Sequence, residues 1–368
     1  MRSALITDWL DKYGGAERVL TAICELYQFD YYYAYVNKMS SDDLKKVFST
    51  KNVQVVDSAM LRRSKPYFRY LMPLFPFVVN SFNRQTKGND VDLVISSSWV
   101  LSKGYRQNKE IHVCYLQARN FKYIWEEADL YFKGPLKMLS FIKGGLQKFD
   151  IRKAQNPDYL ISNSVFVKDW VKKKYDRDSV VIYPPVEVED FYINEVKKDY
   201  YITIGRLEPY KRFDILIDAF NKNGKKLVVI GDGSQLKNLQ KMATGDISFL
   251  GYKNKTEIKK YLSEAKGFLY AGVEDFGIAI VEALASGIPV IAYEGGAVKE
   301  IIEENKNGIT FNKQTAASLN DSIEQFEENE HLFCPHAIRH SALKFSKRRF
   351  QQEFDEFIQS VTPQVMVA

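Results

Sequence analysis

Short apolar runs rich in β-forming residues alternate with helix-length segments along the whole chain, and this alternation limits the fold more than any other feature. A first series of these runs covers residues 4–7, 53–56, 93–96, 112–116, 159–162 and 180–183. A second series covers residues 201–204, 227–230, 247–250, 267–270, 290–293 and 309–311. Apolar strands separated by helices are typical of parallel sheets that are covered on both faces. The pattern therefore predicts an α/β protein with two Rossmann-like, doubly wound parallel-sheet domains.

A pair of prolines separates the two series. Pro184 and Pro185 are followed by an acidic stretch, and together they favour an extended backbone. We predict an N-terminal domain over 1–183, a linker over 184–198, a C-terminal domain over 199–345, and a final helix over 346–368 that crosses back to the first domain. Doubly wound sheets bind ligands beyond the carboxyl ends of their strands, so we expect one cleft between two facing domains.

The composition is that of a globular protein, with 45% hydrophobic and 27% charged residues. No run approaches 18 apolar residues, and the first residues form a short strand pattern instead of a signal peptide, so we expect a cytoplasmic protein. Cys24, Cys114 and Cys334 lie far apart and outside any Cys-x-x-Cys spacing. The sequence thus predicts neither a disulfide framework nor a zinc site.

Two carboxylates flank a predicted strand-to-helix turn in the second half of the chain. Glu274 falls in the turn, and Glu282 falls just over one turn into the following helix. The backbone N–H groups of Phe276, Gly277 and Ile278 begin that helix, and such groups suit an anion or a sugar hydroxyl. We expect one ligand to contact both glutamates.

Two further strand-to-helix loops carry residues suited to phosphate. Gly14 and Gly15 follow the first strand, where glycines allow a ligand to approach the backbone and the next helix offers N–H groups. Arg206 and Lys211 lie five residues apart around Pro209, a spacing that allows both cations to converge on one diphosphate. These cations would matter most in a transition state in which a leaving nucleotide gains negative charge.

Several of these motifs together resemble the retaining glycosyltransferases of family 4 (group 1), which have the GT-B fold, and especially its mannosyltransferase-like members. They are Glu-x7-Glu at 274–282, Gly-Arg-Leu with a following Lys at 205–211, Gly-Gly-Ala-Glu-Arg at 14–18 and Tyr-Pro-Pro-Val at 183–186. The resemblance implies an acceptor-binding first domain and a nucleotide-sugar-binding second domain. It also implies that Glu274 lies by the donor sugar, that Glu282 binds the ribose, and that Arg206 and Lys211 neutralise the diphosphate.

The resemblance implies further site residues and one departure. Asp232 and Tyr252 lie in turns that match the family's segments near the base and ribose, although both turns are equally acceptable as structural. Family members often carry a histidine in the first domain, which is absent from the matching run at 116–125. The side chains expected on the acceptor side there are Gln117, Arg119 and Lys122. No side-chain general base is identified, and the leaving phosphate oxygen would take the acceptor proton.

The predicted reaction is metal-independent transfer of a hexose with retained anomeric configuration, and no cofactor is expected. GDP-mannose is the first donor candidate and a UDP-hexose the second. The predicted acceptor is a lipid-linked saccharide in bacterial surface polysaccharide or lipopolysaccharide biosynthesis, and the alternative is a soluble acceptor.

Basic charge is concentrated in the first half of the chain. Residues 1–183 hold 29 Lys and Arg against 19 Asp and Glu, whereas the remainder is acidic. The segments 61–79 and 131–149 interleave cations with aromatic residues, a pattern that favours contact with anionic lipid. We predict a peripheral enzyme on the inner face of the cell membrane; the alternative is a buried helix with solvated cations.

Other classes of protein share some of these features. A nucleic-acid-binding protein could have a basic half, but no recognised binding motif is present. A nucleotide-binding protein without transferase activity also stays open. A dinucleotide-dependent oxidoreductase is disfavoured because Gly14-Gly15 lacks the Gly-x-Gly-x-x-Gly spacing. An inverting enzyme of the same fold is the nearest alternative among transferases.

Overall fold

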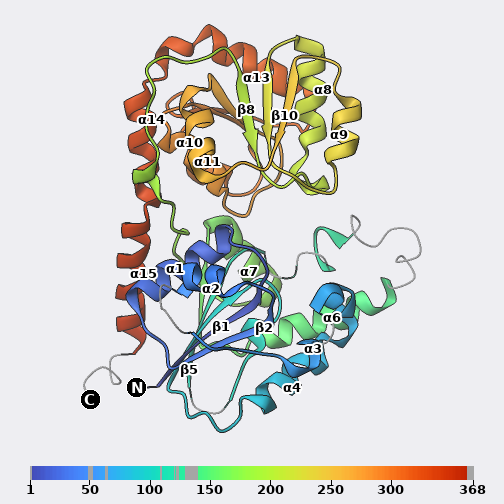
Figure 1. Ribbon diagram of the computed structural model, residues 1–368, viewed down its shortest axis with the longest axis vertical. Helices are drawn as coiled ribbons and strands as arrows, with labels where there is room; N and C mark the ends of the chain where they lie inside the picture. The colour runs from blue at the N-terminus through green and yellow to red at the C-terminus, as the bar shows by residue number, and fades with distance from the viewer. Residues whose placement is uncertain are drawn as a thin grey trace. The chain divides into compact units, whose positions relative to one another are not determined.

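The computed structural model describes residues 2–48, 53–62, 65–107, 110–119, 121, 124–128 and 140–362. The chain divides into two compact units (Figure 1). Unit 1 consists of Met1–Pro185 and Phe350–Ala368, and unit 2 consists of Val186–Arg349. Each unit holds one parallel sheet with helices on both faces. This arrangement confirms the predicted fold class.

The sheet of unit 1 has seven described strands in the order β3-β2-β1-β4-β5-β6-β7. They are β1 (Ser3–Leu10), β2 (Tyr31–Asn37), β3 (Val55–Asp57), β4 (Leu93–Ser98), β5 (Ile111–Leu116), β6 (Tyr159–Ser162) and β7 (Val180–Val181). The sequence prediction omits β2, whose run Tyr-Tyr-Tyr-Ala-Tyr-Val-Asn is aromatic and not aliphatic. Aromatic residues are also strand formers, and all but the ends of this strand are buried.

Helices cover both faces of this sheet. They are α1 (Gly15–Leu26), α2 (Ser41–Phe48), α3 (Ala59–Arg62), η1 (Lys65–Leu74), α4 (Phe75–Gln85), η2 (Ser102–Gly104), α6 (Ser140–Lys153), α7 (Val165–Tyr175) and α15 (Lys347–Val361). On one face, Phe350, Phe354 and Ile358 of α15 join α1 and α2 in a buried apolar cluster. On the other face, α4 and α6 pack against β1 and β4. The last helix therefore belongs to the core of unit 1.

Unit 2 has a sheet of six described strands in the order β10-β9-β8-β11-β12-β13. The strands are β8 (Tyr201–Ile204), β9 (Leu227–Ile230), β10 (Ile247–Gly251), β11 (Gly267–Tyr270), β12 (Val290–Tyr293) and β13 (Gly308–Phe311). The helices are η5 (Val188–Asp190), η6 (Pro209–Lys211), α8 (Phe213–Asn223), α9 (Leu236–Met242), α10 (Lys255–Glu264), α11 (Ile278–Ala285), α12 (Val298–Ile301), α13 (Ala316–Glu328), η7 (Glu330–Leu332), α14 (Pro335–Ala342) and η8 (Leu343–Phe345).

Both sheets reverse their strand order beside the first strand. The reversal lies between β1 and β4 in unit 1 and between β8 and β11 in unit 2. Loops leaving the two strands at such a point run in opposite directions and open a crevice at the carboxyl edge. The structure thus indicates one candidate binding edge in each unit.

The stretch after the two prolines packs onto unit 2. Val186 N–H donates to the carbonyl of Phe345 at 3.0 Å, and Lys255 forms ion pairs with Glu187 and Asp190. The boundary of the compact unit therefore lies directly after Pro185, earlier than the end of the expected linker.

His112 makes the stability of unit 1 depend on pH. Its side chain is 2% exposed on β5, and Nε2 lies 2.8 Å from Ser96 Oγ. Burial lowers the pKa of His112 to about 3. The unfolded chain, with an ordinary histidine pKa near 6.5, therefore binds the proton more readily, and stability falls as the pH drops below about 6.5.

We expect the free energy of unfolding to be about 2 kcal/mol lower at pH 5 than at pH 7 because of this histidine. Urea titrations followed by tryptophan fluorescence measure it, since all four tryptophans (Trp9, Trp99, Trp125 and Trp170) belong to unit 1. The His112→Gln variant should have a shallower slope between pH 5 and 6.5. Equal slopes in both proteins would contradict the expectation.

Candidate functional site

The reversal point of unit 2 brings together two loops that are far apart in the sequence. Because β8 and β11 are neighbouring parallel strands, the loops that leave them begin at the same edge of the sheet. Lys211 ends η6 in the first loop. Tyr270 is the last residue of β11, and Glu274 lies four residues beyond it in the second loop. These three side chains form what we call the lysine–glutamate cluster.

The lysine–glutamate cluster is compact and mostly shielded from solvent. Lys211 Nζ forms an ion pair with Glu274 Oε1, and the Tyr270 hydroxyl donates to the same oxygen. Lys211 Nζ also lies 3.2 Å from the Tyr270 hydroxyl oxygen. The side chains of Lys211 and Glu274 are 14% and 17% exposed. The cluster thus holds one cation and one anion, both partly open to a ligand.

The hydroxyl of Tyr270 is fixed as a donor. Burial, and then the neighbouring Glu274 carboxylate, raise the pKa of Tyr270 well above its ordinary value. The phenol therefore stays protonated and orients one carboxylate oxygen of Glu274. Sequence reasoning missed Tyr270; a tyrosine ending a buried strand four residues before Glu274 was the available signal.

Two glycines allow the backbone of the cluster to pack this closely. A Cβ on Gly272 would lie 2.9 Å from Lys211 Cα. A Cβ on Gly296 would lie 2.1 Å from the carbonyl oxygen of Glu274, and Gly296 has a φ of +80°. Side chains at either position would push the loops apart, so glycine is required to hold Glu274 in place.

Arg206 lies in the same loop as Lys211 but on its exposed side. Its Nη2 donates to the Tyr210 hydroxyl at 3.3 Å. The structure therefore brings Lys211 into direct contact with Glu274, whereas the Arg206 side chain is exposed. A diphosphate held by both cations would have to reach from the cluster to this exposed side chain.

The predicted helix N-terminus is present after the cluster. Helix α11 begins at Ile278, and Gly277 precedes it with a φ of 105°. Phe276 is 3% exposed and packs edge-to-face on Phe345 at 5.4 Å between ring centroids. Glu282 is the fifth residue of the helix and is 7% exposed. Glu274 and Glu282 thus occupy the loop and the helix, as the sequence predicted.

The other two predicted donor residues lie in the loops that follow β9 and β10. Asp232 is exposed, and its carboxylate accepts the Gly233 N–H at 2.7 Å. The carbonyl of Asp232 accepts the N–H of Leu207 at 2.9 Å, which ties this loop to the one after β8. Tyr252 follows β10 and is 83% exposed. All these loops leave the carboxyl edge of the sheet.

In unit 1 the predicted residues surround the carboxyl edge in the same way. Gly14 precedes α1, Gly15 begins it, and Gly14 N–H donates to Glu17 at 2.9 Å. Gln117 follows β5, and its Nε2 donates to Ser97 Oγ at 2.9 Å. The remaining two positions differ: Arg119 is 7% exposed and stacks over the Phe166 ring, whereas Lys122 lies outside the described residues.

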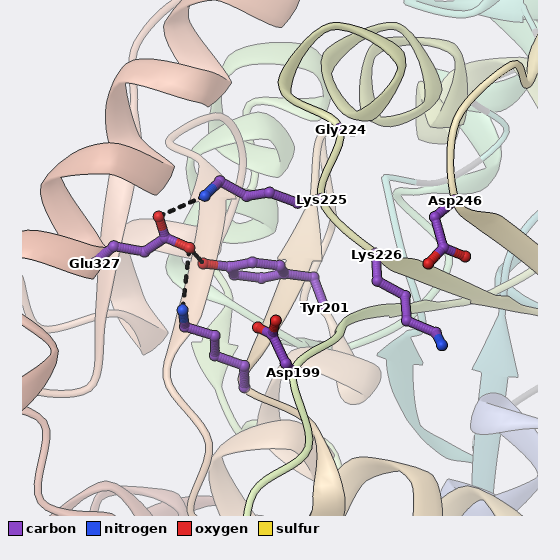
Figure 2. A pocket seen from close by; sticks show the side chains of 8 residues that line it. Asp199, Tyr201, Gly224, Lys225, Lys226, Asp246 and Glu327 are labelled. Atoms are coloured by element: carbon purple, nitrogen blue, oxygen red, sulfur yellow. Dashed lines mark hydrogen bonds and ion pairs between the residues drawn. The ribbon is translucent and has the colours of Figure 1, made fainter.

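A pocket of about 510 Å³ lies at the opposite, amino edge of the unit 2 sheet (Figure 2). In it, Glu327 of α13 accepts from the Tyr201 hydroxyl at 2.9 Å and pairs with Lys225 at 2.6 Å and Lys266 at 3.1 Å. These contacts join α13 to the starts of β8 and β11. The paired charges of Glu327, Lys225 and Lys266 hold α13 against the sheet, and the pocket lies at the edge opposite the lysine–glutamate cluster.

Two features are absent from the part of the chain that the structure describes. Within it, no three His, Cys, Asp or Glu side chains are grouped so that they could hold a metal ion. No helix among the described residues has the length and apolar character needed to cross a membrane.

The family model for glycosyl transferases group 1 matches residues 187–344, which include the whole lysine–glutamate cluster. Among curated proteins, the O-antigen chain mannosyltransferase RfbU of Salmonella typhimurium is 28% identical over 220 residues, covering 55% of this chain and 58% of the relative. An uncharacterized glycosyltransferase of Methanocaldococcus jannaschii is 29% identical over 182 residues, covering 48% and 52%. The chain spans about half the length of these relatives.

Solved structures match almost the whole chain in fold. The Anabaena protein HepE in complex with UDP and glucose has a TM-score of 0.72 at 18% identity, covering 97% of this chain and 99% of its own. Sucrose-phosphate synthase of Thermosynechococcus elongatus has a TM-score of 0.76 at 14% identity, covering 98% and 99%. With the family match over residues 187–344, these results show that unit 2 is similar to the glycosyl transferases of group 1 and that the chain has the GT-B fold.

Proposed function

We propose that this chain is a retaining, metal-independent glycosyltransferase that moves a hexose from a nucleoside-diphosphate sugar to a saccharide acceptor. The observation that carries the proposal is the lysine–glutamate cluster at the reversal point of unit 2, inside the segment that matches the family. A partly open Lys and Glu at this edge suit a ligand with both a diphosphate and sugar hydroxyls.

In the proposed reaction the donor diphosphate lies against Lys211, with Arg206 on the outer side of the same loop. Glu274, oriented by Tyr270, accepts hydrogen bonds from the donor sugar, and Glu282 accepts from the ribose. The bond between the anomeric carbon and the phosphate oxygen breaks, and the acceptor oxygen bonds to that carbon on the same face. The acceptor proton passes to the departing phosphate oxygen, while Lys211 stabilises the growing negative charge.

The other site residues predicted from the sequence are proposed to bind the donor or the acceptor. Asp232, Tyr252 and the amides of Phe276, Gly277 and Ile278 are proposed to contact the nucleotide or sugar from unit 2. Gly14 and Gly15 are the proposed contribution of unit 1. Gln117, Arg119 and Lys122 are proposed for the acceptor.

The donor is proposed to be GDP-mannose, with a UDP-hexose as the alternative. A mannosyltransferase among the relatives supports the first, and the UDP bound to HepE supports the second. We expect GDP to raise the melting temperature of the wild-type chain more than UDP or ADP does, because at equal concentration the nucleotide with the lowest Kd stabilises the folded chain most. A ligand at 100 times its Kd raises the free energy of unfolding by about 2.7 kcal/mol.

The shift should shrink in the Lys211→Ala variant and should persist in excess EDTA. If no nucleoside diphosphate stabilises the wild-type chain, the proposed function fails. A larger shift with UDP would overturn only the choice of donor.

The acceptor is proposed to be lipid-linked and presented by an anionic membrane, as in bacterial surface polysaccharide assembly. Helices α3, α4 and α6, which lie side by side in Figure 1, form what we call the cationic face. Their Lys and Arg residues are Arg62, Arg84, Lys143, Lys148, Arg152 and Lys153. Their one acid, Asp150, is fully buried in an ion pair.

Exposed apolar side chains accompany these cations. Phe77 of α4 is 65% exposed, and Leu74 and Met60 are each 40% exposed. An aromatic residue among cations suits the headgroup region, where each cation contributes about 1 kcal/mol. The apolar side of α4 is buried while Phe77 points outward, and the alternative of a buried helix with solvated cations stays open.

We expect Arg84→Glu with Lys148→Glu to weaken binding to phosphatidylglycerol-containing vesicles by at least 30-fold, since at least ~2 kcal/mol is lost. Phe77→Ser should weaken it further. Tyr192→Ser, which removes an aromatic side chain that is 49% exposed on unit 2, is the matched control and should bind normally. Flotation assays measure the bound fraction. A wild-type chain that does not float with anionic vesicles would favour a soluble acceptor.

A further inference from the structure

Two tryptophans form a parallel pair at the reversal point of the unit 1 sheet. Trp9 is the penultimate residue of β1, and Trp99 directly follows β4, the neighbouring strand. Their ring centroids are 6.0 Å apart and their planes differ by 4°. Both side chains are partly exposed. The pair therefore presents aromatic surface at the edge where a doubly wound sheet binds its ligand.

The surrounding structure fixes this pair in place. Trp9 packs on the buried ring of Phe68 at 5.2 Å between centroids. The N–H of Trp99 donates to the carboxylate of Asp8 at 2.5 Å, and Asp8 is fully buried. The carbonyl of Trp99 accepts the N–H of Phe121 at 2.6 Å. Held in this way, the rings would lose little conformational entropy when a ligand binds.

Polar groups accompany the aromatic surface. Within the described parts of the chain, neither indole N–H donates to a protein acceptor, although tryptophans that pack inside proteins usually find one. The side chain of Gln117 lies next to Trp99, because its Nε2 bonds Ser97 Oγ and its backbone N–H bonds the Ser98 carbonyl at 3.0 Å. The edge thus combines two rings with three neighbouring N–H or amide groups.

We propose that Trp9 and Trp99 form the platform on which a pyranose ring of the acceptor stacks. A pyranose has one face of C–H bonds, which packs on an aromatic ring, and a rim of hydroxyls, which the indole N–H groups and Gln117 can bind. The pair carries no charge, which suits a neutral sugar better than a phosphate. This assignment rests on the proposed transferase function and adds the acceptor subsite to it.

The competing explanation is that both tryptophans only close the apolar cluster beneath them, which includes Phe68. The two explanations predict different results in a direct binding measurement, because only a sugar platform binds a free glycoside. Saturation-transfer NMR on the full chain with methyl α-mannopyranoside, methyl α-glucopyranoside and methyl β-galactopyranoside requires neither donor nor turnover. We expect ring protons of at least one of the three glycosides to receive saturation from the wild-type chain.

Trp9→Leu and Trp99→Leu should each reduce that signal at least fivefold and raise the acceptor KM about tenfold, with the donor KM unchanged. Trp170→Phe, at a tryptophan that is 7% exposed in another apolar cluster, is the matched control and should keep the signal. If a leucine variant fails to fold, Trp9→Phe and Trp99→Phe keep an aromatic ring and should still halve the signal.

An undiminished glycoside signal in the Trp9 and Trp99 variants would overturn the platform. Loss of the wild-type signal on addition of GDP or UDP would also overturn it, because the tryptophan pair would then bind a nucleotide base. Absence of any glycoside signal from a wild-type chain that transfers sugar would overturn the platform and leave the function standing. Failure of every nucleotide to stabilise the chain would instead overturn the function, and the glycoside experiment would still decide what the tryptophans bind.

Discussion

Replacing Lys211 with alanine is expected to lower kcat/KM for sugar transfer by about 100- to 1,000-fold, the loss typical of one electrostatic donor to a transition state, or ~3–4 kcal/mol. The structure places the Lys211 ammonium in an ion pair with Glu274. Its removal takes positive charge from the proposed diphosphate site and leaves the shielded Glu274 carboxylate to repel the donor. Both effects raise the activation barrier for sugar transfer.

Initial-rate kinetics with a saturating acceptor measure this loss. Lys222→Ala is the matched control, because Lys222 lies on the following helix, α8, and its ion pair with Asp218 is exposed. It should change kcat/KM by less than twofold. Glu274→Gln should also reduce kcat strongly while leaving nucleotide binding intact. A Lys211→Ala enzyme within threefold of the wild type would contradict the proposed role.

Replacing Lys103 with methionine is expected to destabilise unit 1 by about 3–5 kcal/mol. Lys103 in η2 and Asp150 in α6 are both 0% exposed, and their charged atoms lie 2.7 Å apart. Asp150 also accepts from Trp125 Nε1 at 2.9 Å and from the Tyr175 hydroxyl at 2.7 Å. Without the lysine, a fully buried carboxylate would keep two neutral donors and no compensating charge.

Urea unfolding followed by tryptophan fluorescence measures the loss in unit 1 alone. The double variant Lys103→Met with Asp150→Asn should recover a large part of it, because the buried charge is then absent. Lys45→Met is the matched control: the side chains of Lys45 and Asp42, which form an ion pair on α2, are 55% and 80% exposed, and the loss of this pair should cost less than 1 kcal/mol. Additive effects of the Lys103 and Asp150 substitutions would contradict the expected coupling.

The fold could be predicted because most strands carry their own local apolar signal. The apolar runs at 201–204 and 267–270 coincide with β8 and β11. Strand β2 escaped prediction because tyrosines replace aliphatic residues in it. Glu282 could be assigned to a helix and Glu274 to a loop because both assignments depend on local pattern. None of these inferences needs the order of the strands in the sheet.

The partners of the site residues could not be predicted in the same way. Lys211 and Glu274 are separated by 63 residues, and Trp9 and Trp99 by 90 residues, so their contacts depend on which strands become neighbours. Arg206 and Lys211 looked equivalent in the sequence. In the structure the Arg206 side chain faces outward, whereas Lys211 contacts Glu274. The helical turn η6, which ends at Lys211, changes the direction of the chain between the two residues.

The sequence by itself determined that this protein has two parallel sheets, and that its phosphate-suited loops follow particular strands, since periodicity and turn residues are local properties of the chain. Tertiary structure alone decided that Lys211 meets Glu274, that Lys103 neutralises Asp150, and that two tryptophans stack at one edge. The first and third of these contacts exist because the strand order reverses beside β1 and β8, which brings residues distant in the chain to the same end of a sheet.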